Sequence, residues 1–388
     1  MTVRYRVDIE DHSGVTVASF KDFLSLDVEI KIADKGDYQL SLSGFDERVG
    51  LIEDDYLVRV WMTDPAYNIP WANVFTGIHK TMVDSFFSNG RKTWVSYGPA
   101  CEEILDKEYI AYSSGVSQSK IEPMAGTPVS TVMHRFVREN VGDLATVANG
   151  RFYDGVNPVV LGIDLGQGPS WTGSRAQKPL LGVLQELRQY SIEQGDQVDF
   201  EMRYVGGYQF EFRGGKIFAD RTANGLTASS NGLNGAGNAP VIFAPQYGNV
   251  SSATRSKSRY TETNLVVALG QGVGEKRQYA VVKNPGSIAA SPIAQRAVMM
   301  NATNQRLAEE LIAVGVARLD ENRAEEKYRF EARRGAQVLW RDYFPGDFVT
   351  VEDFRTGQRY DRQLVGVSLK VDGDGEQIEN VRMRFDDA

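Results

Sequence analysis

The clearest pattern in this chain is a period-two alternation of apolar and polar residues near its two ends. The apolar members of these runs are Val3, Tyr5, Val7 and Ile9 near the start, and Val365, Val367, Leu369 and Val371 near the end. Such alternation is typical of half-buried antiparallel strands. Turn sequences such as Asn89-Gly90 and Pro345-Gly346 separate the runs. The chain is therefore predicted to be mainly β, within the α+β class.

The density of strand patterns predicts how the chain is organised into domains. Residues 1–98 carry a close succession of short strands, which predicts a first small β-barrel or a sandwich. Residues 99–222 mix helical segments with a hairpin, and residues 223–245, rich in Gly, Asn and Ser, predict a linker. Residues 246–388 predict a second β-barrel, interrupted at about 291–326 by a helical insertion with an apolar stripe.

Composition narrows the classes of protein that fit. The net charge is −8 and the pI is about 5.2, which argues against a protein that grips nucleic acid through a basic face. Cys101 is the single cysteine, so no intrachain disulfide is possible and a reducing compartment is expected. The first residues lack the apolar core of a secretory signal, and no apolar run is long enough to predict a membrane span.

Two short motifs resemble catalytic or nucleotide-binding signatures but stand in the wrong context. Gly270 to Gly274 (GQGVG) follows a predicted strand, yet the next element is a strand and not the helix that a dinucleotide site requires. The motif is predicted to be a hairpin loop. Ser117 to Lys120 has the SxxK spacing, but Pro123 follows closely and the flanking sequence is a Ser/Gly loop.

The sequence contains no complete metal-binding motif. His12, His79 and His134 are far apart in the sequence and belong to no zinc motif. Asp372 to Glu376 resembles part of a calcium loop, but a hairpin turn is favoured. Stacking of a sugar on Trp171 stays open. No catalytic, cofactor-binding or metal-binding residue is predicted, and the chain is not expected to be an enzyme.

The order of these segments resembles the baseplate-hub or tail-tip hub family of long-tailed bacteriophages. Members are similar to the hub of contractile-tailed phages and to the amino-terminal part of tail-associated lysins. The resemblance rests on five stretches: GRKTWVSYGPACEEILDKEYI (90–110), VDFEMRYVGGYQFEFRGG (198–215), NLVVALGQGVGEKRQYAVV (264–282), DYFPGDFVTVED (342–353) and LVGVSLKVDGDGEQIENVRMRF (364–385). Many relatives carry an enzymatic or receptor-binding extension, and we expect any such activity to lie on another protein.

The resemblance implies a structural virion protein at the tail tip, assembled in the host cytoplasm. It implies a homotrimer whose two tube-type barrels per chain form a ring, joining the sixfold tail tube to the threefold tip and lining a DNA channel. The implied partners are the tail tube or distal tail protein, the tape measure protein and tip or fibre proteins, with DNA only in transit. The alternatives are a cell-wall hydrolase, which would clear peptidoglycan, and a carbohydrate-binding β-module, which would bind it without clearing.

Polar residues that alternate with the core are the candidates for the channel wall or the subunit interface. Because Lys and Arg contacts to phosphate would retain passing DNA, the wall is predicted to be acidic or neutral. The candidate wall residues are Asp8, Glu10, Glu29 and Glu352. Arg382 and Arg384, like Arg4 and Arg6, share this alternation and are expected to pair with neighbouring subunits.

Overall fold

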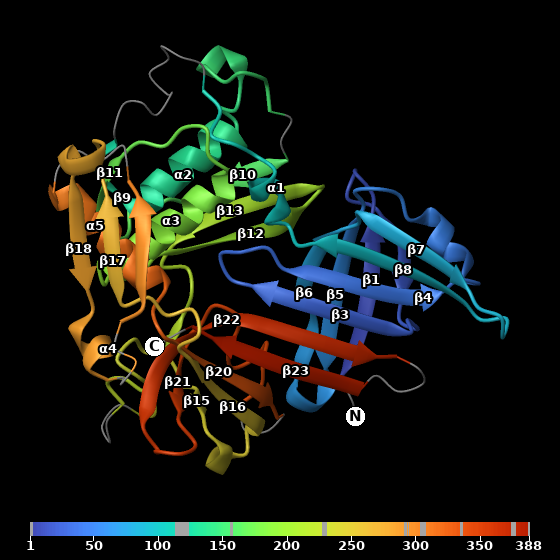
Figure 1. Cartoon of the computed structure of the whole chain (residues 1–388). Helices are drawn as coiled ribbons and strands as arrows, with labels where there is room; N and C mark the ends of the chain where they lie inside the picture. Colours follow the sequence, from blue (N-terminus) through green and yellow to red (C-terminus); the bar gives the residue numbers. More distant parts are fainter. Residues whose placement is uncertain are drawn as a thin grey trace. The chain divides into compact units, whose positions relative to one another are not determined.

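The computed structural model divides into two compact units, drawn together in Figure 1. The large unit contains residues 1–253 and 330–385, and the insertion unit contains residues 254–329. The described residues are 3–112, 124–155, 158–226, 231–290, 293, 295–302, 308–333, 337–373 and 378–386. Strands dominate both units, so the predicted fold class, mainly β with added helices, is confirmed.

The first β region is a sandwich of two sheets. Its strands are β1 (Arg4–Glu10), β2 (Thr16–Phe20), β3 (Ser25–Lys31), β4 (Asp37–Ser43), β5 (Leu57–Asp64), β6 (Ile69–Ile78), β7 (Thr81–Phe86) and β8 (Lys92–Pro99). One sheet has the order β2-β1-β5-β6, and β3, β4, β8 and β7 belong to the other. Apolar residues such as Val7, Leu40 and Val60 fill the space between them. Across the described residues the strand orders are open, and no ladder closes into the predicted barrel.

A single long sheet runs through both predicted β regions. Its strands follow the order β16-β20-β23-β22-β3-β4-β8-β7, which we call the long sheet. The carboxyl-terminal members are β16 (Val250–Ser258), β20 (Glu325–Ala332), β22 (Arg359–Asp372) and β23 (Ile378–Phe385). Three shorter strands complete this part: β14 (Asp220–Arg221) and β15 (Ile242–Phe243) pair with β21 (Phe348–Glu352), which pairs with β22.

The pairing of β3 with β22 joins the two ends of the chain. The ladder runs antiparallel from Gly366 opposite Lys31 to Asp372 opposite Ser25. Sequence analysis predicted two separate barrels, whereas these strands share one sheet. The apolar positions of the two strands fall opposite one another, with Leu369 facing Val28, so pairing them continues a single buried face.

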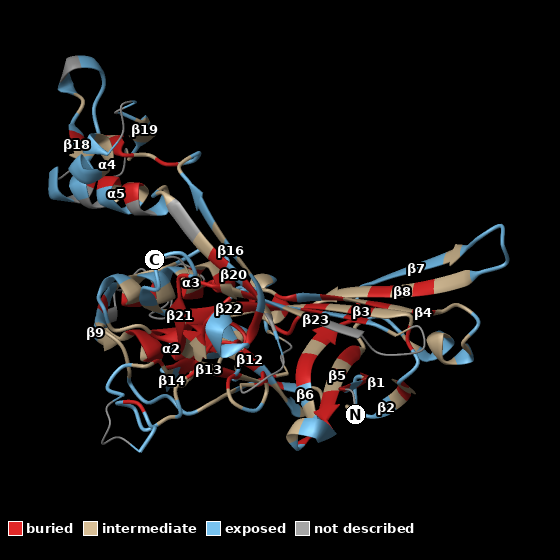
Figure 2. Cartoon of the chain, turned by 90° about the horizontal axis from the view of Figure 1, so that it is seen from below, coloured by how far each residue is buried: buried red, intermediate tan, exposed pale blue. Residues whose placement is uncertain are grey.

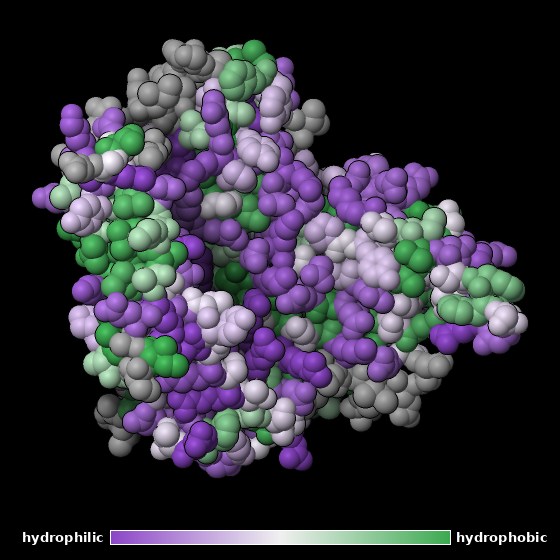
Figure 3. All heavy atoms as spheres, in the orientation of Figure 1, coloured by the Kyte–Doolittle hydropathy of each residue, from purple (hydrophilic) through white to green (hydrophobic). Residues whose placement is uncertain are grey.

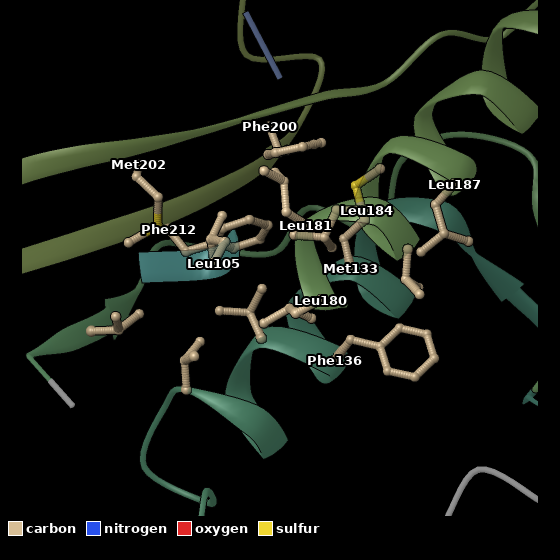
Figure 4. Packing of buried hydrophobic residues seen from close by; sticks show 14 of the residues in the cluster. Leu105, Met133, Phe136, Leu180, Leu181, Leu184, Leu187, Phe200, Met202 and Phe212 are labelled. Atoms are coloured by element: carbon tan, nitrogen blue, oxygen red, sulfur yellow. The ribbon is translucent and has the colours of Figure 1, made fainter. Parts of the chain in front are cut away.

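The middle region packs two helices against a hairpin. Its elements are α1 (Glu103–Asp106), β9 (Met124–Pro128), α2 (Val129–Asn140), β10 (Val159–Leu161), β11 (Ser170–Gly173), α3 (Leu180–Glu193), β12 (Asp199–Gly206) and β13 (Gln209–Gly215). The predicted aromatic hairpin is confirmed, with Met202 opposite Phe212. Phe136 of α2, Leu184 of α3 and Phe200 of β12 meet in one apolar cluster, shown in Figure 4.

The described part of the predicted linker, 223–245, is folded against its surroundings. The side-chain amide of the buried Asn234 donates hydrogen bonds to the carbonyls of Asp220 (2.9 Å) and Thr222 (3.0 Å). Its carbonyl accepts from the backbone N–H of Ala236 and of Asn238. A Gly- and Asn-rich composition predicted a spacer, but here the hydrogen bonds of the Asn234 side chain hold the segment in one conformation.

The insertion unit is a three-stranded sheet with a helix on one face. Its elements are β17 (Leu265–Leu269), β18 (Tyr279–Lys283), α4 (Pro285–Ala289), β19 (Ala297–Asn301) and α5 (Ala308–Glu321), and the sheet order is β18-β17-β19. The GQGVG loop joins the antiparallel strands β17 and β18, so the hairpin prediction is confirmed. The helix predicted over 291–326 is shorter, because residues 297–301 form strand β19, which pairs in parallel with β17.

Candidate functional site on the long sheet

One face of the long sheet is polar over its central strands. On β3, Leu26 and Val28 point into the core, whereas Asp27 and Glu29 point away from it. The ladders carry this alternation across the neighbouring strands. We define the polar face as the outward residues Asp27, Glu29 and Lys31 of β3, Asp37 and Gln39 of β4, Ser368 and Lys370 of β22, and Arg382 and Arg384 of β23.

The structure brings three of the six predicted site residues together on this face. Ser368 lies opposite both Glu29 and Arg382, so the acidic and basic side chains occupy one row of the sheet. Arg384 lies in the next row, opposite Gly366, which in turn faces Lys31. A role of Glu29, Arg382 and Arg384 in a channel or interface stays a prediction, but a single surface now carries all three.

Charges of both signs are interleaved on the polar face. Lys31 Nζ lies 3.2 Å from a carboxylate oxygen of Glu29 and 3.8 Å from one of Asp37. Burial, followed by the nearby Glu29 carboxylate, raises the pKa of Asp37 above its ordinary value. Arg382 Nε lies 3.3 Å from a carboxylate oxygen of Glu331 on β20. The acidic residues lie on β3 and β4, and the basic ones lie on β22 and β23 apart from Lys31 of β3, so the face is mixed in charge.

Asp8 lies elsewhere, on the first sheet of the sandwich. It is buried on β1, which lies between β2 and β5. An ion pair with Arg6 (2.9 Å) and a hydrogen bond donated by the Ser19 hydroxyl (2.6 Å) occupy its carboxylate. Arg6 also lies over the rings of Trp61 and Trp71. These partners belong to the same chain, so Asp8 and Arg6 already neutralise one another.

Glu10 is buried beneath the middle region. Arg59 Nη1 donates to its carboxylate at 2.5 Å, and the Tyr204 hydroxyl donates at 2.7 Å. Tyr204 comes from β12, whose hairpin covers this part of the first sheet. At the hairpin turn, the Tyr208 hydroxyl donates to the backbone carbonyl of Asp55 at 2.6 Å. The alternation of apolar and polar residues on β1 indicates that Glu10 points away from the core of the sandwich. It does not indicate that the β12–β13 hairpin covers Glu10.

Glu352 is buried at the end of β21. Hydrogen bonds from the Gln246 side chain, and then from Arg359 (3.1 Å), lower the pKa of its carboxyl below the ordinary value. Asp8, Glu10 and Glu352 therefore all have partners within the chain. Their assignment to a channel wall or interface stays a prediction without a shared surface to support it.

A cavity of about 710 Å³ lies in the large unit among the sandwich, the β12–β13 hairpin and the segment around Trp340. Two ion pairs line it, Arg213 with Glu201 (2.8 Å) and Arg221 with Asp347 (2.8 Å). Glu102 also lines it, and its carboxylate accepts a long hydrogen bond of 3.5 Å from the backbone N–H of Met202. Burial raises the pKa of Glu102 to about 7. No sequence pattern selected this residue, because Glu102 and Glu103 are adjacent in the chain, whereas the two carboxylates of a glycosidase face one another across a cleft.

Glu102 is expected to make the chain less stable as the pH rises from about 4.5 to about 7. Its pKa in the folded chain lies above the value of 4.5 expected in the unfolded chain. Between these two pH values the folded chain keeps the Glu102 proton while the unfolded chain releases it, so the free energy of unfolding falls as the pH rises. Above the folded-state pKa both states are deprotonated and the loss is complete. Glu102→Gln, which stays neutral, should melt at the same temperature as the parent at pH 4 and at a higher temperature at pH 8. Thermal melting at both pH values tests this, and equal melting temperatures at pH 8 would contradict it.

The three histidines have separate structural roles. His12 makes edge contacts with Tyr56 and Tyr208. His79 stacks on Trp94 and shares a hydrogen bond of 2.7 Å with the Ser96 hydroxyl. His134 makes an edge contact with the ring of Phe212. In the part of the chain that the structure describes, no group of three or more His, Cys, Asp or Glu side chains could hold a metal ion.

Two of the remaining sequence motifs fall wholly or partly outside the described residues. Ser117 to Lys120 lies outside the described residues, as do the last residues of the Asp372 to Glu376 turn. Trp171 is buried, with Arg175 over its ring, so its indole is not open to a sugar. Within the described ranges, no helix is both long and apolar enough to span a bilayer.

The two outer strands of the long sheet are exposed. All but one residue of β7 are exposed, including Met82 and Phe86, and Figure 2 shows the β7–β8 hairpin projecting from the sandwich. Phe87 N–H donates to the Arg91 carbonyl at 2.8 Å, and the ladder from there is regular. The odd residues of β7 therefore bond to β8, and the N–H groups of Met82, Asp84 and Phe86 point to the open edge.

The two edges differ in charge. Beside β7 a groove of about 610 Å³ is lined by Glu53, Asp54 and Asp84 together with apolar residues such as Ile52. The other edge strand, β16, has the sequence VSSATRSKS, with Arg255 and Lys257 as its charged residues. One edge of the long sheet thus has acidic surroundings and the other carries basic side chains.

Solved structures with a similar fold include tail proteins and a PdpA-VgrG complex. The 43 kDa tail protein of prophage MuSo2 from Shewanella oneidensis has a TM-score of 0.56 at 12% identity, over 99% of this chain and 97% of that chain. A tail protein from Neisseria meningitidis MC58 has a TM-score of 0.52 at 13% identity, over 98% and 96%. A Francisella PdpA-VgrG complex in a half-lidded form has a TM-score of 0.50 at 9% identity, over 99% and 57%. At such identities the likeness establishes the fold.

The fold is that of the phage tail proteins and the VgrG proteins, so the predicted resemblance to the tail-hub class is confirmed. The chain belongs to the family of Siphovirus ReqiPepy6 Gp37-like proteins, whose family model matches residues 6–382. No curated protein sequence matches the chain.

Proposed function

We propose that this protein is the hub of a phage tail tip, a homotrimer in which three long sheets join edge to edge around a channel. The observation that carries the proposal is the long sheet itself, which has two exposed edges and one polar face. The hub adapts the sixfold tail tube to a threefold tip. Its place is the virion tail, and it acts without catalysing a reaction.

The exposed edges support a head-to-tail contact between copies. Natural proteins usually protect an edge strand, because its unpaired N–H and C=O groups recruit other strands. Here β7 offers such groups and β16 is the opposite outer strand. A contact between two different edges is heterologous, and it closes into a ring when the rotation per subunit is a simple fraction of a turn. The acidic surroundings of Asp84 and the basic Lys257 favour joining β7 of one copy to β16 of the next.

The polar face is the proposed wall of the channel. A ring closed through β7 and β16 turns one face of every long sheet inward, and an apolar inner face would exclude water and DNA. Asp27, Glu29 and Asp37 give this wall three negative charges, and Glu331 beside Arg382 adds a fourth. They balance the four basic residues of the same face, Lys31, Lys370, Arg382 and Arg384. The wall is thus close to neutral and would not hold DNA through counterion release as a basic groove does.

The proposed binding partners of the hub are other tail components. A ring of sheets offers one rim to the tail tube or distal tail protein and the other to tip or fibre proteins. The tape measure protein and then DNA pass through the channel. The phage tail proteins of similar fold support this placement, and the absence of any recognised catalytic motif from the sequence supports a structural role.

Asp84→Pro is expected to convert the trimer to a monomer without unfolding the chain. Proline lacks an N–H and the Asp84 N–H points to the open edge of β7, so the substitution removes a donor for the next subunit but none for β8. The mass of the full chain by light scattering tests this, at concentrations where the parent is a trimer.

Asp84→Ala is the matched control for this substitution. It removes the same carboxylate and its surface ion pair with Lys92 (3.1 Å) but keeps the backbone N–H. The alanine variant should remain a trimer. A trimeric proline variant would exclude closure through β7, and a monomeric parent in assembled tips would exclude the trimer altogether.

A further inference from the structure

The sheet of the insertion unit has two faces that differ sharply in burial. Helix α5 covers one of them, where Val266, Ala268 and Ala280 are buried with Leu311 of the helix. Gly315 allows this close packing, because a Cβ at that position would lie 2.6 Å from a methyl carbon of Val282. The second face bears the alternate residues of the same strands.

We call this second face the open face, and its rows follow from the strand register. Val267 at its centre lies opposite Val281 on one side and Met299 on the other. Tyr279 is 67% exposed, Val281 47% and Met299 73%, whereas Leu265 at one end of β17 is buried. The nine positions of the open face are Leu265, Val267 and Leu269 of β17, Tyr279, Val281 and Lys283 of β18, and Ala297, Met299 and Asn301 of β19. Figure 3 shows the apolar side chains gathered over these strands.

The charge of the open face is of one sign. Its nine positions include one charged residue, Lys283, at a corner. At the opposite corner, Arg277 Nη2 donates to the Asn301 side-chain carbonyl at 2.7 Å. An apolar centre therefore lies between two cationic corners, and no carboxylate shares the nine positions. A ligand that covers this face must be apolar in the middle and acidic toward its ends.

We propose that the open face binds an amphipathic helix with acidic flanks from another protein. A helix already packs on the opposite face, and small α/β layers are commonly completed by helices on both faces of a sheet. Strand β17 has five residues and spans about 17 Å, which a helix of about 11 residues matches in length. Three exposed side chains of the size of Tyr279, Val281 and Met299 form an apolar patch of the kind that marks protein contacts.

This contact is separate from the proposed ring. The ring uses the edges β7 and β16, whereas the helix would lie on a sheet face built from β17, β18 and β19. A hub can thus keep its own subunit contacts and hold a second tail component through the insertion unit. Loss of one contact should leave the other intact, which makes the two proposals independently testable.

The experiment uses the full chain and two synthetic peptides of 14 residues, about four helical turns. Both carry the same Leu stripe on an Ala background, and the flanking positions are Glu in one peptide and Lys in the other. Binding of a fluorescent label on each peptide is followed by anisotropy. The Glu peptide should bind at least tenfold more tightly than the Lys peptide. Equal binding of both peptides would overturn the proposal.

Three substitutions locate the binding. Met299→Glu should weaken the Glu peptide tenfold or more, and Lys283→Glu should reverse the preference in favour of the Lys peptide. Ile312→Ser, at an exposed apolar position of α5, is the matched control and should bind as the parent does. All three positions are exposed, so thermal melting should be unchanged. Binding that Met299→Glu leaves unaltered would place the peptide elsewhere and refute the assignment.

Two other occupants are separate outcomes of the same design. Binding to vesicles of phosphatidylcholine and phosphatidylglycerol that Met299→Glu abolishes, without peptide binding, would assign the open face to a lipid surface. Self-association that Met299→Glu abolishes while Asp84→Pro leaves it in place would assign it to a second copy. Either result overturns the proposal of a helical partner.

Discussion

Val367→Asp is expected to abolish folding of the large unit and with it any assembly. Val367 is 1% exposed on β22 and lies between Ile30 of β3 and Met383 of β23. A carboxylate buried there has no cation to pair with, and its burial costs several kcal/mol. A typical domain is stable by only about 5–15 kcal/mol, so the substitution removes much or all of that margin. Soluble yield and thermal melting of the purified chain measure the effect.

Ser368→Asp is the control one residue along the strand. Ser368 is exposed on the polar face, opposite Glu29 on one side and Arg382 on the other. The added charge remains in water and should change the free energy of unfolding by less than about 1 kcal/mol. Greater damage from Ser368→Asp would show that the strand is shifted by one residue, because such a shift exchanges the two faces. Equal damage from both substitutions would also contradict the register described above.

Asp199→Ala is expected to cause the second-largest loss, about 3 kcal/mol, because it breaks a buried polar network. Arg188 Nε on α3 donates to the Asp199 carboxylate at 2.5 Å, and the Gln363 side-chain amide donates to it at 2.9 Å. Gln363 lies on β22 and accepts from Arg188 at 2.7 Å. Removing the carboxylate deletes the acceptor of the Arg188 Nε bond and one of two acceptors of the Gln363 amide, which also donates to the Gly346 carbonyl at 3.0 Å. These bonds lie where the middle region meets the long sheet. Urea unfolding followed by circular dichroism measures the loss.

Asp196→Ala provides the comparison for that network. Asp196 also pairs with a cation, Lys216 at 2.5 Å, but both side chains are about half exposed. Exposed ion pairs contribute about 0–1 kcal/mol, so this variant should unfold close to the parent. If the two alanine variants lose the same stability, burial does not distinguish the pairs and the network has no special role.

The alternation of apolar and polar residues predicted the strands well, because in the structure the apolar positions are the buried ones. Leu26 and Val28 alternate with Asp27 and Glu29 in the sequence, and in the structure the first pair is buried and the second faces outward. The β12–β13 hairpin and the β17–β18 hairpin were predictable for the same reason, since the turn and the flanking alternation lie close together in the chain. Short-range signals suffice wherever the partners are neighbours in sequence.

What could not be predicted depends on partners distant in the sequence. Alternation shows that Glu10 and Glu29 both oppose the core, but only Glu10 is covered, by Tyr204 almost two hundred residues later. The pairing of β3 with β22 is equally non-local. Two separate barrels were therefore predicted, whereas the long sheet connects the two β regions. In residues 297–301 the neighbouring β17 determines the strand, whereas the surrounding sequence favoured a helix.

The β3–β22 ladder also constrains when the chain can finish folding. A ribosome releases residues 25–31 long before residues 359–372, so β3 must wait with one edge uncovered while more than three hundred residues are made. An uncovered edge recruits other strands, and pairing across such a separation is slow because the loop entropy is lost before the contact forms. A prematurely terminated chain would keep that edge for good and could not take its place in a ring. We therefore expect chains that end before β22 to be excluded from the proposed assembly.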